Sequence, residues 1–344
     1  MRRLLIFIAV LSAFSASAQD YHFSQFYANK MMLNPALTGR FNEDYRLSLI
    51  HRNQWRGIDA SFNSTSVGGE INLREGILKD DKVGIGIYAY NDQLGEKVIV
   101  NNSVYLSTAY HHFLDHSRRH NLSGGAQFGY TNKKLDGSSL TFGNQYQSFS
   151  YNPSLSHNED LTKLNNGYID IQAGLAYSFL LSDKWNLSTG VSLYDITTPR
   201  ESSIDSLDNE LSSRYVWHAG ASYKLNSTIT LYPKILYVTQ AKAHDLNFGL
   251  NMGYDLHTKT PLVIYVGAWI RPQDAVIGLI GAKIKNNLEI KFSHDFTTSS
   301  LRQVNDVEGF KHSGRPSAYE ISITYTGLLN RATPHEYTVP CGIF

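Results

Sequence analysis

The sequence predicts an all-β protein, a transmembrane antiparallel β-barrel of about fourteen strands of the outer-membrane type. Long segments alternate between apolar residues and small or polar residues with a period of two, as strands in a membrane wall require. The first eighteen residues have the pattern of an export signal. The chain is rich in tyrosine and glycine, with 22 Tyr and 26 Gly among its 344 residues.

The composition excludes several other classes of protein. Apolar residues make up 42% and the formal net charge is only +1, so an intrinsically disordered chain is excluded. The same small charge supplies no field that would attract nucleic acid. One cysteine excludes an internal disulfide framework and a zinc site built from cysteines. A mean hydropathy of −0.28 argues against a bundle of membrane helices.

Residues 1–18 are interpreted as a secretory signal peptide. Arg2 and Arg3 precede an apolar run over residues 4–10, and Ala16-Ser17-Ala18 is a small-residue cleavage site. We expect cleavage after Ala18. No later stretch reaches the roughly 18 apolar residues that a spanning helix needs. The protein is therefore expected to be exported to the cell outer membrane and held in its lipid by strands.

Residues 19–44 form an N-terminal periplasmic or plug segment that precedes the first strand. Phe23, Phe26 and Tyr27 have partial helical spacing with Leu33, and Asn34-Pro35 would stop a helix. Such a segment would plug the lumen or dock a periplasmic partner. An ordinary cap over the barrel mouth is the equally open alternative.

Residues 45–326 are predicted to be the barrel itself. The alternation is cleanest near residues 245–256, where Leu246, Phe248 and Leu250 oppose Asn247 and Gly249. Most runs approach the roughly 9–11 residues that cross a bilayer when tilted, whereas a secreted soluble β protein, the alternative, has strands of about 5–6. The predicted strands are 45–52, 65–73, 82–90, 103–110, 121–131, 170–179, 185–194, 215–225, 229–240, 245–256, 262–270, 275–284, 288–295 and 319–326.

Aromatic residues and connection lengths support the barrel. Residues near the ends of runs would form an interfacial girdle; these are Trp185, Tyr215, Trp217, Tyr254 and Trp269. The longest connections, 132–169, 195–214 and 296–318, all fall at one end of the predicted barrel and the short ones at the other. Outer-membrane barrels have short periplasmic turns and long external loops, so the long connections are expected outside.

Charged residues within the strands are expected to point into the lumen. Arg46, Lys234, Glu289, Lys291 and Glu320 oppose apolar neighbours, and an Arg or Lys on the lipid face at mid-depth costs roughly 2–4 kcal/mol. They should therefore be luminal and paired. The hypothesis is a salt-bridge network that fills the lumen, with an ion pathway as the alternative.

Residues 327–344 are interpreted as a periplasmic tail. Pro334, Pro340 and Gly342 are incompatible with a further strand. The chain ends on Phe344, a residue typical of the end of outer-membrane proteins when it closes the last strand. Cys341 is either an inert passenger or a residue that pairs with a partner.

The search for catalytic motifs predicts that the chain is not an enzyme and carries no cofactor. It finds no Walker loop, HExxH, CxxC or GxSxG. His111, His112, His116 and His120 form either a metal site or, more simply, a solvated basic turn. His294 and Asp295 suggest a hydrolase dyad, but adjacent residues of a strand point to opposite faces.

Several short strings resemble one family, the type IX secretion system membrane proteins of the PorP/SprF type, in the same order along nearly the whole mature chain. In this sequence they are Phe23-Ser24-Gln25-Phe26-Tyr27, Leu33-Asn34-Pro35-Ala36-Leu37-Thr38-Gly39, Arg52-Asn53-Gln54-Trp55, Leu140-Thr141-Phe142-Gly143-Asn144-Gln145-Tyr146, Leu231-Tyr232-Pro233, Arg271-Pro272-Gln273-Asp274-Ala275, Ser293-His294-Asp295 and Pro340-Cys341-Gly342-Ile343-Phe344. His294 departs from the Tyr that the family usually has, and Gly342 replaces a Pro.

The resemblance implies an outer-membrane barrel of the type IX protein secretion and gliding motility machinery. It implies periplasmic ring or peptidoglycan-binding components and a secreted surface adhesin as partners, and assigns no catalytic residues. It leaves open whether the chain is core machinery or the dedicated partner of one adhesin. The candidate structural or partner-contact residues are Arg52, Gln54, Trp55, Arg271, Asp274, His294, Asp295 and Phe344.

The width of the barrel favours an anchor over a conduit. About fourteen strands enclose a lumen wide enough to need filling by loops or a plug, and folded cargo would not pass through it. We therefore expect an anchor or docking platform for secreted surface proteins and periplasmic machinery. The alternative is a passive outer-membrane porin or solute channel.

Overall fold

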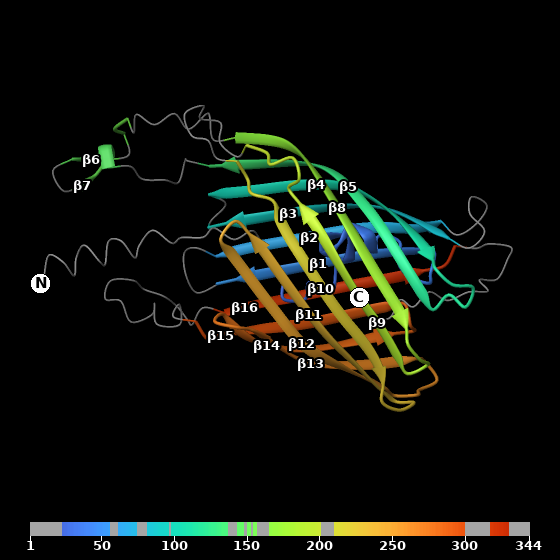
Figure 1. The fold of residues 1–344 in the computed structure, drawn as a ribbon. Helices are drawn as coiled ribbons and strands as arrows, with labels where there is room; N and C mark the ends of the chain where they lie inside the picture. The colour runs from blue at the N-terminus through green and yellow to red at the C-terminus, as the bar shows by residue number, and fades with distance from the viewer. Residues whose placement is uncertain are drawn as a thin grey trace, which may run out of the picture.

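Fourteen antiparallel strands close into one barrel in the computed structural model (Figure 1). The structure describes residues 23–55, 61–73, 81–95, 98–136, 143–147, 150–152, 154–156, 165–200, 210–299 and 317–329. The barrel strands are β1 (Tyr45–Gln54), β2 (Phe62–Leu73), β3 (Lys82–Leu94), β4 (Ile99–Phe113), β5 (His120–Leu135), β8 (Asn165–Leu180), β9 (Trp185–Tyr194), β10 (Arg214–Lys224), β11 (Ile229–Gln240), β12 (Ala243–Asp255), β13 (Leu262–Arg271), β14 (Ala275–Ile284), β15 (Leu288–Thr297) and β16 (Ser317–Gly327).

The smaller elements are not part of the barrel wall. Helix α2 (Lys30–Leu33) and the 3-10 turn η2 (Pro35–Leu37) belong to the N-terminal segment. The connection between β5 and β8 carries η4 (Gly143–Gln145) and a two-stranded sheet of β6 (Tyr146–Gln147) and β7 (Ser150–Tyr151). No helix among the described residues combines the length and the apolar character needed to cross a bilayer.

Consecutive strands pair as antiparallel neighbours, and the barrel closes where β1 pairs with β16, with Arg46 opposite Thr326. We call the end that holds the β2–β3, β4–β5 and β14–β15 connections the short-turn end, and the opposite end, toward which β6 and β7 lie in Figure 1, the long-loop end. β1 begins and β16 ends at the short-turn end.

The fold class predicted from the sequence is confirmed, but several strands are longer than predicted. β4 runs from Ile99 to Phe113 and β8 from Asn165 to Leu180, whereas the alternation indicated only 103–110 and 170–179. The added residues include Asn101, Asn102 and Asn166, which are polar on both faces. The hydrogen-bonded ladder continues beyond the region where one face contacts lipid, so hydrophobic alternation underestimates strand length.

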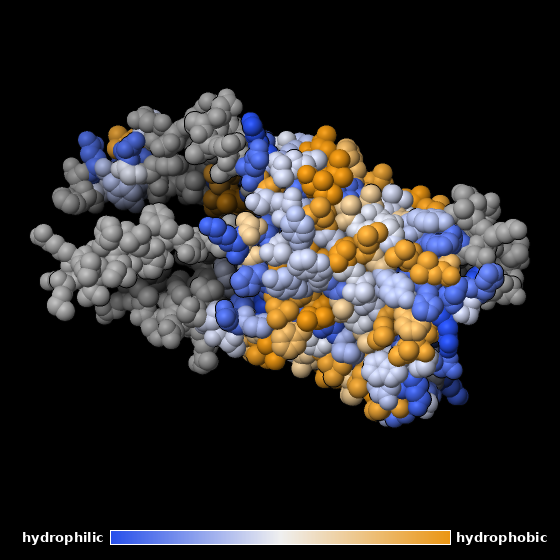
Figure 2. All heavy atoms as spheres, viewed as in Figure 1, coloured by the Kyte–Doolittle hydropathy of each residue, from blue (hydrophilic) through white to orange (hydrophobic). Residues whose placement is uncertain are grey.

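On the face drawn in Figure 2, strongly apolar residues are spread among paler ones over the middle of the wall, and the most hydrophilic residues gather toward both ends. Alternate side chains are exposed on this wall along several strands, including Leu106 and Leu175, each 57% exposed. Trp185, Tyr215, Trp217 and Tyr254 are among the outward-facing aromatic residues, as a girdle requires. Trp269 was wrongly predicted for this girdle. It is 1% exposed and lies in the lumen.

The N-terminal segment, residues 23–44, occupies the lumen and appears in blue inside the barrel in Figure 1. Its direction is defined by its two ends. The Ser24 hydroxyl donates to Asp295, near the long-loop end of β15, and the Asp44 N–H donates to the carbonyl of Gly327, at the short-turn end of β16 (2.9 Å). Residues 23–44 therefore run through the lumen from the long-loop end to the start of β1.

Apolar side chains of this segment build a second hydrophobic core inside the barrel. Phe26 and Tyr27 contact the ring of Trp269, edge-on at 5.7 Å and stacked at 5.4 Å between centroids. Leu33 and Leu37 join the same cluster. The luminal face is thus not polar throughout. From β8 to β14 it presents apolar side chains that pack against those of the N-terminal segment, which explains why Trp269 points inward.

We predict that a charge at mid-depth on the outer wall destabilises the barrel, whereas the same change at its rim does not. Leu106 lies in the middle of β4, and Leu114 follows the strand on the same face, where it is 54% exposed. Leu106→Arg should lower the free energy of unfolding in lipid vesicles by about 2–4 kcal/mol, and Leu114→Arg by about 0–1. Equal losses in urea titrations of the two variants would contradict the lipid-facing assignment.

Candidate functional site

An ion cluster at the long-loop end of the lumen holds the start of the N-terminal segment. It consists of Arg52 on β1, Arg271 on β13, Asp295 on β15 and Glu320 on β16, grouped around Ser24. Arg52 donates to Asp295 at 3.0 Å and also pairs with Glu320. Arg271 approaches the same Asp295 oxygen at 3.6 Å. These four side chains are at most 3% exposed, so two cations and two anions lie in contact within a buried site.

The cluster binds the segment through its backbone as well as its side chains. Glu320 accepts hydrogen bonds from the N–H groups of Ser24 and Gln25, at 2.5 and 2.8 Å. The Ser24 hydroxyl donates to Asp295 at 2.6 Å and accepts from Arg52 and Arg271, each at 2.7 Å. Hydrogen bonds to charged groups are the stronger kind. β1 from the start of the barrel and β13, β15 and β16 from its end are therefore tied to one point of the segment.

Gln25 extends this attachment along the β15–β16 hairpin. Its side-chain NH₂ donates to the hydroxyl of Ser293 (2.9 Å), and its carbonyl oxygen accepts from Ser322 (2.7 Å). Ser293, Ser322 and Glu320 are all buried on the luminal face. The alternation of β15 and β16 thus presents a row of polar side chains that matches the polar start of the segment.

The residues around the cluster brace its arginines. Asp274 accepts from Arg271 at 2.7 Å across the β13–β14 turn, and Asp245 lies 3.9 Å from the same guanidinium. Gln54 accepts from the Nε of Arg52 at 3.1 Å. The Arg-x-x-Asp spacing of residues 271–274 therefore serves a tight turn in which the carboxylate orients the cation toward Ser24.

Asn34 fixes the middle of the segment to the wall. Its side-chain NH₂ lies 3.1 Å from the carbonyl oxygens of Leu175 and Val191, on β8 and β9. Its side-chain oxygen accepts the N–H of Ala36 at 2.9 Å and so caps η2. Helix α2 ends at Leu33, as Asn34-Pro35 predicts. Asn34 therefore caps η2, where the segment changes direction, and also attaches the segment to β8 and β9.

Glycines on the luminal face make room for η2. A Cβ at Gly125 would lie 2.4 Å from the carbonyl carbon of Pro35, and one at Gly174 would lie 2.0 Å from the side-chain oxygen of Asn34. Both distances are below any real Cβ contact. The small residues facing the lumen are thus the places where the segment approaches the strand backbone.

The structure places the remaining predicted site residues elsewhere. Trp55 follows β1 and packs edge-on against Phe62 at 5.3 Å. His294 points away from the ion cluster and contacts the ring of Phe296 at 4.7 Å. Phe344 and Cys341 lie outside the described residues, as does the predicted signal peptide. Arg52, Arg271, Asp274 and Asp295 meet in one cluster, whereas Trp55 and His294 do not join it.

Ser24, Gln25 and Asp245 are functional residues that the sequence alone does not single out. The signal that points to the first two is the Phe23-Ser24-Gln25-Phe26-Tyr27 string, whose polar members interrupt an aromatic run. A polar pair between aromatics indicates a segment that must satisfy hydrogen bonds while buried. Asp245 carries no comparable signal, because it is a single acidic residue near the start of a strand and belongs to no recurring pattern.

The in-strand charges point into the lumen, as predicted. Arg46 pairs with Glu70 at 2.5 Å, and Lys291 pairs with Glu289. The Lys234 ammonium lies 3.7 Å from the centre of the Tyr27 ring, a cation–π distance. Each of these side chains opposes outward-facing apolar neighbours, as the cost of a charge in lipid requires.

The histidines near the β4–β5 turn do not form one site. His111 is buried in the lumen, where it contacts the carbonyl oxygen of Thr38 (2.7 Å), while His112 faces outward and pairs with Asp81 (2.9 Å). Hydrogen bonds from Ser117 and from backbone N–H groups lower the pKa of Asp115, in this turn, to about 2. Among the described residues, no group of three or more His, Cys, Asp or Glu is placed to hold a metal ion.

Comparison with protein families gives one match that covers most of the chain. A family model described as "Type IX secretion system membrane protein PorP/SprF" matches residues 15–325. A search of curated proteins finds no match.

Solved structures with a similar fold are outer-membrane barrels. The toluene transporter TbuX of Ralstonia pickettii has 13% identity and a TM-score of 0.47, over 87% of this chain and 93% of its own. A FadL homologue of Pseudomonas aeruginosa has 10% identity and a TM-score of 0.49, over 85% and 92%. BamA of Haemophilus ducreyi, lacking POTRA domains 1–3, has 9% identity and a TM-score of 0.42, over 83% and 71%. These likenesses concern the fold and carry no argument about function.

We predict that Arg52 and Glu320 stabilise the barrel as a coupled pair. Arg52→Met leaves two buried carboxylates with less compensation, and Glu320→Gln weakens the contacts to Ser24 and Gln25. Each single change should cost about 3–5 kcal/mol in free energy of unfolding, and the double variant less than the sum. Arg119→Met, on the exposed β4–β5 turn, is the control and should cost at most about 0.5 kcal/mol. Strict additivity in the urea-unfolding cycle would refute the coupling.

We predict that Gly125→Val displaces η2 and opens the lumen. The new side chain has no space beside Pro35, whereas a Cβ at the neighbouring Gly124 points outward and meets only Leu175, at 3.6 Å. Planar-bilayer recordings should show higher conductance for Gly125→Val than for the wild type, and Gly124→Val should match the wild type. If both valine variants behave alike, the close approach of η2 does not close the lumen.

Proposed function

This chain belongs to the family of type IX secretion system membrane proteins PorP/SprF, and we propose that it acts in the outer membrane as a closed anchor or docking platform. In this proposal the barrel carries secreted surface proteins on one side and periplasmic machinery on the other. Cargo does not pass through its lumen.

The filled lumen is the observation that supports this proposal. Residues 23–44 are attached to the wall at Ser24 by the ion cluster, at Asn34 by strand carbonyls and at Asp44 by Gly327. The described segment is thus fixed near both of its ends and in its middle. A passage wide enough for a folded protein would require all three attachments to break.

The two ends of the barrel suit two kinds of partner. Long connections at one end offer the surface on which a secreted adhesin would be held, because external loops of outer-membrane barrels are the long ones. The short-turn end holds the end of β16, after which the sequence continues into the tail. We propose that periplasmic ring or peptidoglycan-binding components contact this end, and that the protein thereby supports secretion or gliding motility.

The alternatives are a passive porin and an enzyme. A porin needs a continuous aqueous path, and the buried side chains packed around Tyr27 and Trp269 argue against one. An enzyme of the barrel-hydrolase type would need His294 and Asp295 to act together, yet they point to opposite faces of β15. We therefore propose that the chain is neither of these.

We predict that partners on the two sides can be removed separately. Truncation after Leu329 deletes the tail and leaves β16 complete, and a Gly/Ser linker of equal length replacing residues 201–209 alters one long connection. After co-purification in mild detergent and identification by mass spectrometry, the truncation should lose periplasmic type IX components and keep the surface protein. The linker variant should do the reverse.

Each variant serves as the control for the other, because both keep the described barrel intact. Co-migration of the folded form on unheated gels checks that it is intact. A wild-type protein that gives stable ohmic conductance in planar bilayers and binds no type IX component would favour the porin and refute the platform. Partners that remain bound to both variants would refute the assignment of the two surfaces.

A further inference from the structure

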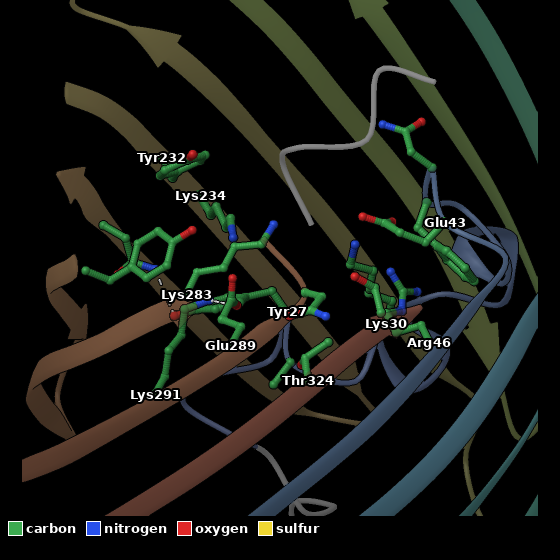
Figure 3. Close-up of a pocket in the computed structure, with 17 residues that line it drawn as sticks. Tyr27, Lys30, Glu43, Arg46, Tyr232, Lys234, Lys283, Glu289, Lys291 and Thr324 are labelled. Atoms are coloured by element: carbon green, nitrogen blue, oxygen red, sulfur yellow. Dashed lines mark hydrogen bonds and ion pairs between the residues drawn. The ribbon is translucent and has the colours of Figure 1, made fainter. Parts of the chain in front are cut away.

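Pro233 lies in the interior of β11, where proline is rare because it has no N–H to donate to a neighbouring strand. It ends the Leu231-Tyr232-Pro233 string. Its neighbours Tyr232 and Lys234 line a cavity inside the barrel (Figure 3). Because side chains alternate along a strand, Pro233 faces outward, toward lipid, and it is exposed there.

The pairing of β11 with its two neighbours shows which hydrogen bond the proline removes. β11 pairs with β12 over its whole length, but its pairing with β10 is interrupted where Pro233 and Tyr232 stand opposite Ala221 and Ser222. All four residues belong to the described part of the chain. An antiparallel strand residue directs its N–H and C=O to the same neighbouring strand, so the regular pairing with β12 places the Pro233 nitrogen on the β10 side. The carbonyl of Ala221 therefore lacks the N–H donor that β11 would otherwise supply.

A hollow of about 680 Å³ in the wall of the barrel lies at this interruption, since Ala221 and Pro233 both line it. Most of its lining is apolar. It combines small residues, among them Gly249 on β12, with larger side chains that include Phe248 and Leu250, both of which are exposed on the outer wall. Its volume is within the roughly 300–1,000 Å³ of ligand sites. The missing ladder bond and an apolar space of ligand size thus coincide.

Aromatic pairs toward both ends of the barrel place the hollow within the hydrocarbon layer. Trp217 stacks with Tyr237 at 5.5 Å between centroids on the long-loop side, and Trp185 stacks with Tyr223 at 4.3 Å on the short-turn side. Aromatic belts mark the two interfaces of a membrane with water. Ala221 lies between these pairs along β10. At this depth an unsatisfied backbone carbonyl is costly, because the bilayer core holds no water to donate to it.

We propose that this hollow binds one hydroxylated acyl chain of a membrane lipid. The bilayer surrounds the outer wall, so acyl chains are the molecules that reach the hollow, and its apolar lining matches them. A plain hydrocarbon chain would leave the Ala221 carbonyl without a donor. A hydroxyl on the chain is the smallest group that donates to it while the chain fills the apolar space. Pro233 thus withholds a donor of the protein and leaves an acceptor for the lipid. This proposal does not rest on the docking function.

The test is native mass spectrometry of the full-length protein in non-ionic detergent, which counts the probe molecules bound to each barrel. Methyl β-hydroxymyristate and methyl myristate are the two probes, and they differ only in the hydroxyl group. We expect one tightly held molecule of the hydroxylated probe. Its binding should saturate at a concentration about three- to tenfold lower than that of the plain probe, the effect of one hydrogen bond.

Two variants separate the apolar space from the hydrogen bond. Ala221→Phe fills the hollow and should abolish the binding of both probes. Pro233→Ala restores an N–H donor for the Ala221 carbonyl, so it should bind both probes equally, with the preference for the hydroxyl lost. Leu106→Phe enlarges an apolar side chain that is exposed on β4, outside the hollow; it is the matched control and should bind as the wild type does.

The outcomes decide the proposal without reference to any protein partner. A hydroxyl preference that the wild type shows and Pro233→Ala loses supports it. Equal binding of the two probes by the wild type identifies an ordinary lipid-facing groove and overturns it, as does a preference that persists in Pro233→Ala. Binding that survives in Ala221→Phe places the probe elsewhere and also overturns it. Migration of unheated samples checks that each variant is folded, and Pro233→Ala keeps the test decisive if Ala221→Phe does not fold.

Discussion

The need to pair every strand inside lipid is the constraint on which the rest of the structure depends. No water in the bilayer core satisfies a free strand edge, so a sheet that crosses it must close. Here closure joins β1 to β16 and sets the width of the lumen. Fourteen strands enclose more space than their own inward side chains can fill. The N-terminal segment fills this space, because it supplies a second layer of side chains within the cylinder.

Two kinds of interaction hold that layer, and they are distributed along the barrel. Phe26, Tyr27 and Leu37 form an apolar core with the β8–β14 side of the wall, which favours burial without specifying one position. The ion cluster supplies position, because Glu320 and Asp295 accept hydrogen bonds from particular donors of Ser24 and Gln25. An unpaired buried charge is costly, so any shift of the segment along the lumen is disfavoured.

The two ends of the lumen hold the N-terminal segment in different surroundings. At the long-loop end, Arg52 and Arg271 contact several carboxylates around Ser24 and fix the start of the segment. Toward the short-turn end, the Tyr27 ring packs beside the ammonium groups of Lys234 and Lys291. The same segment therefore contacts charged residues of the wall along much of the lumen.

The sequence by itself determined the membrane wall: its number of strands, their faces and the inward direction of Arg46 and Glu320. Those features follow from alternation, which is local and repeats every two residues. Strand ends were less accessible, because the ladder continues at Asn101 and Asn166 after the apolar signal ends.

Only the tertiary structure decided what lies opposite each inward residue. Trp269, expected in the girdle, stacks on the ring of Tyr27 in the lumen. His111 and His112 lie on opposite faces of β4. Arg52, Arg271 and Asp295 meet around Ser24. The physical reason is that contacts across a lumen join residues hundreds of positions apart. Periodicity specifies the face of a strand on which a side chain lies, but it does not identify the residue that this side chain contacts across the barrel.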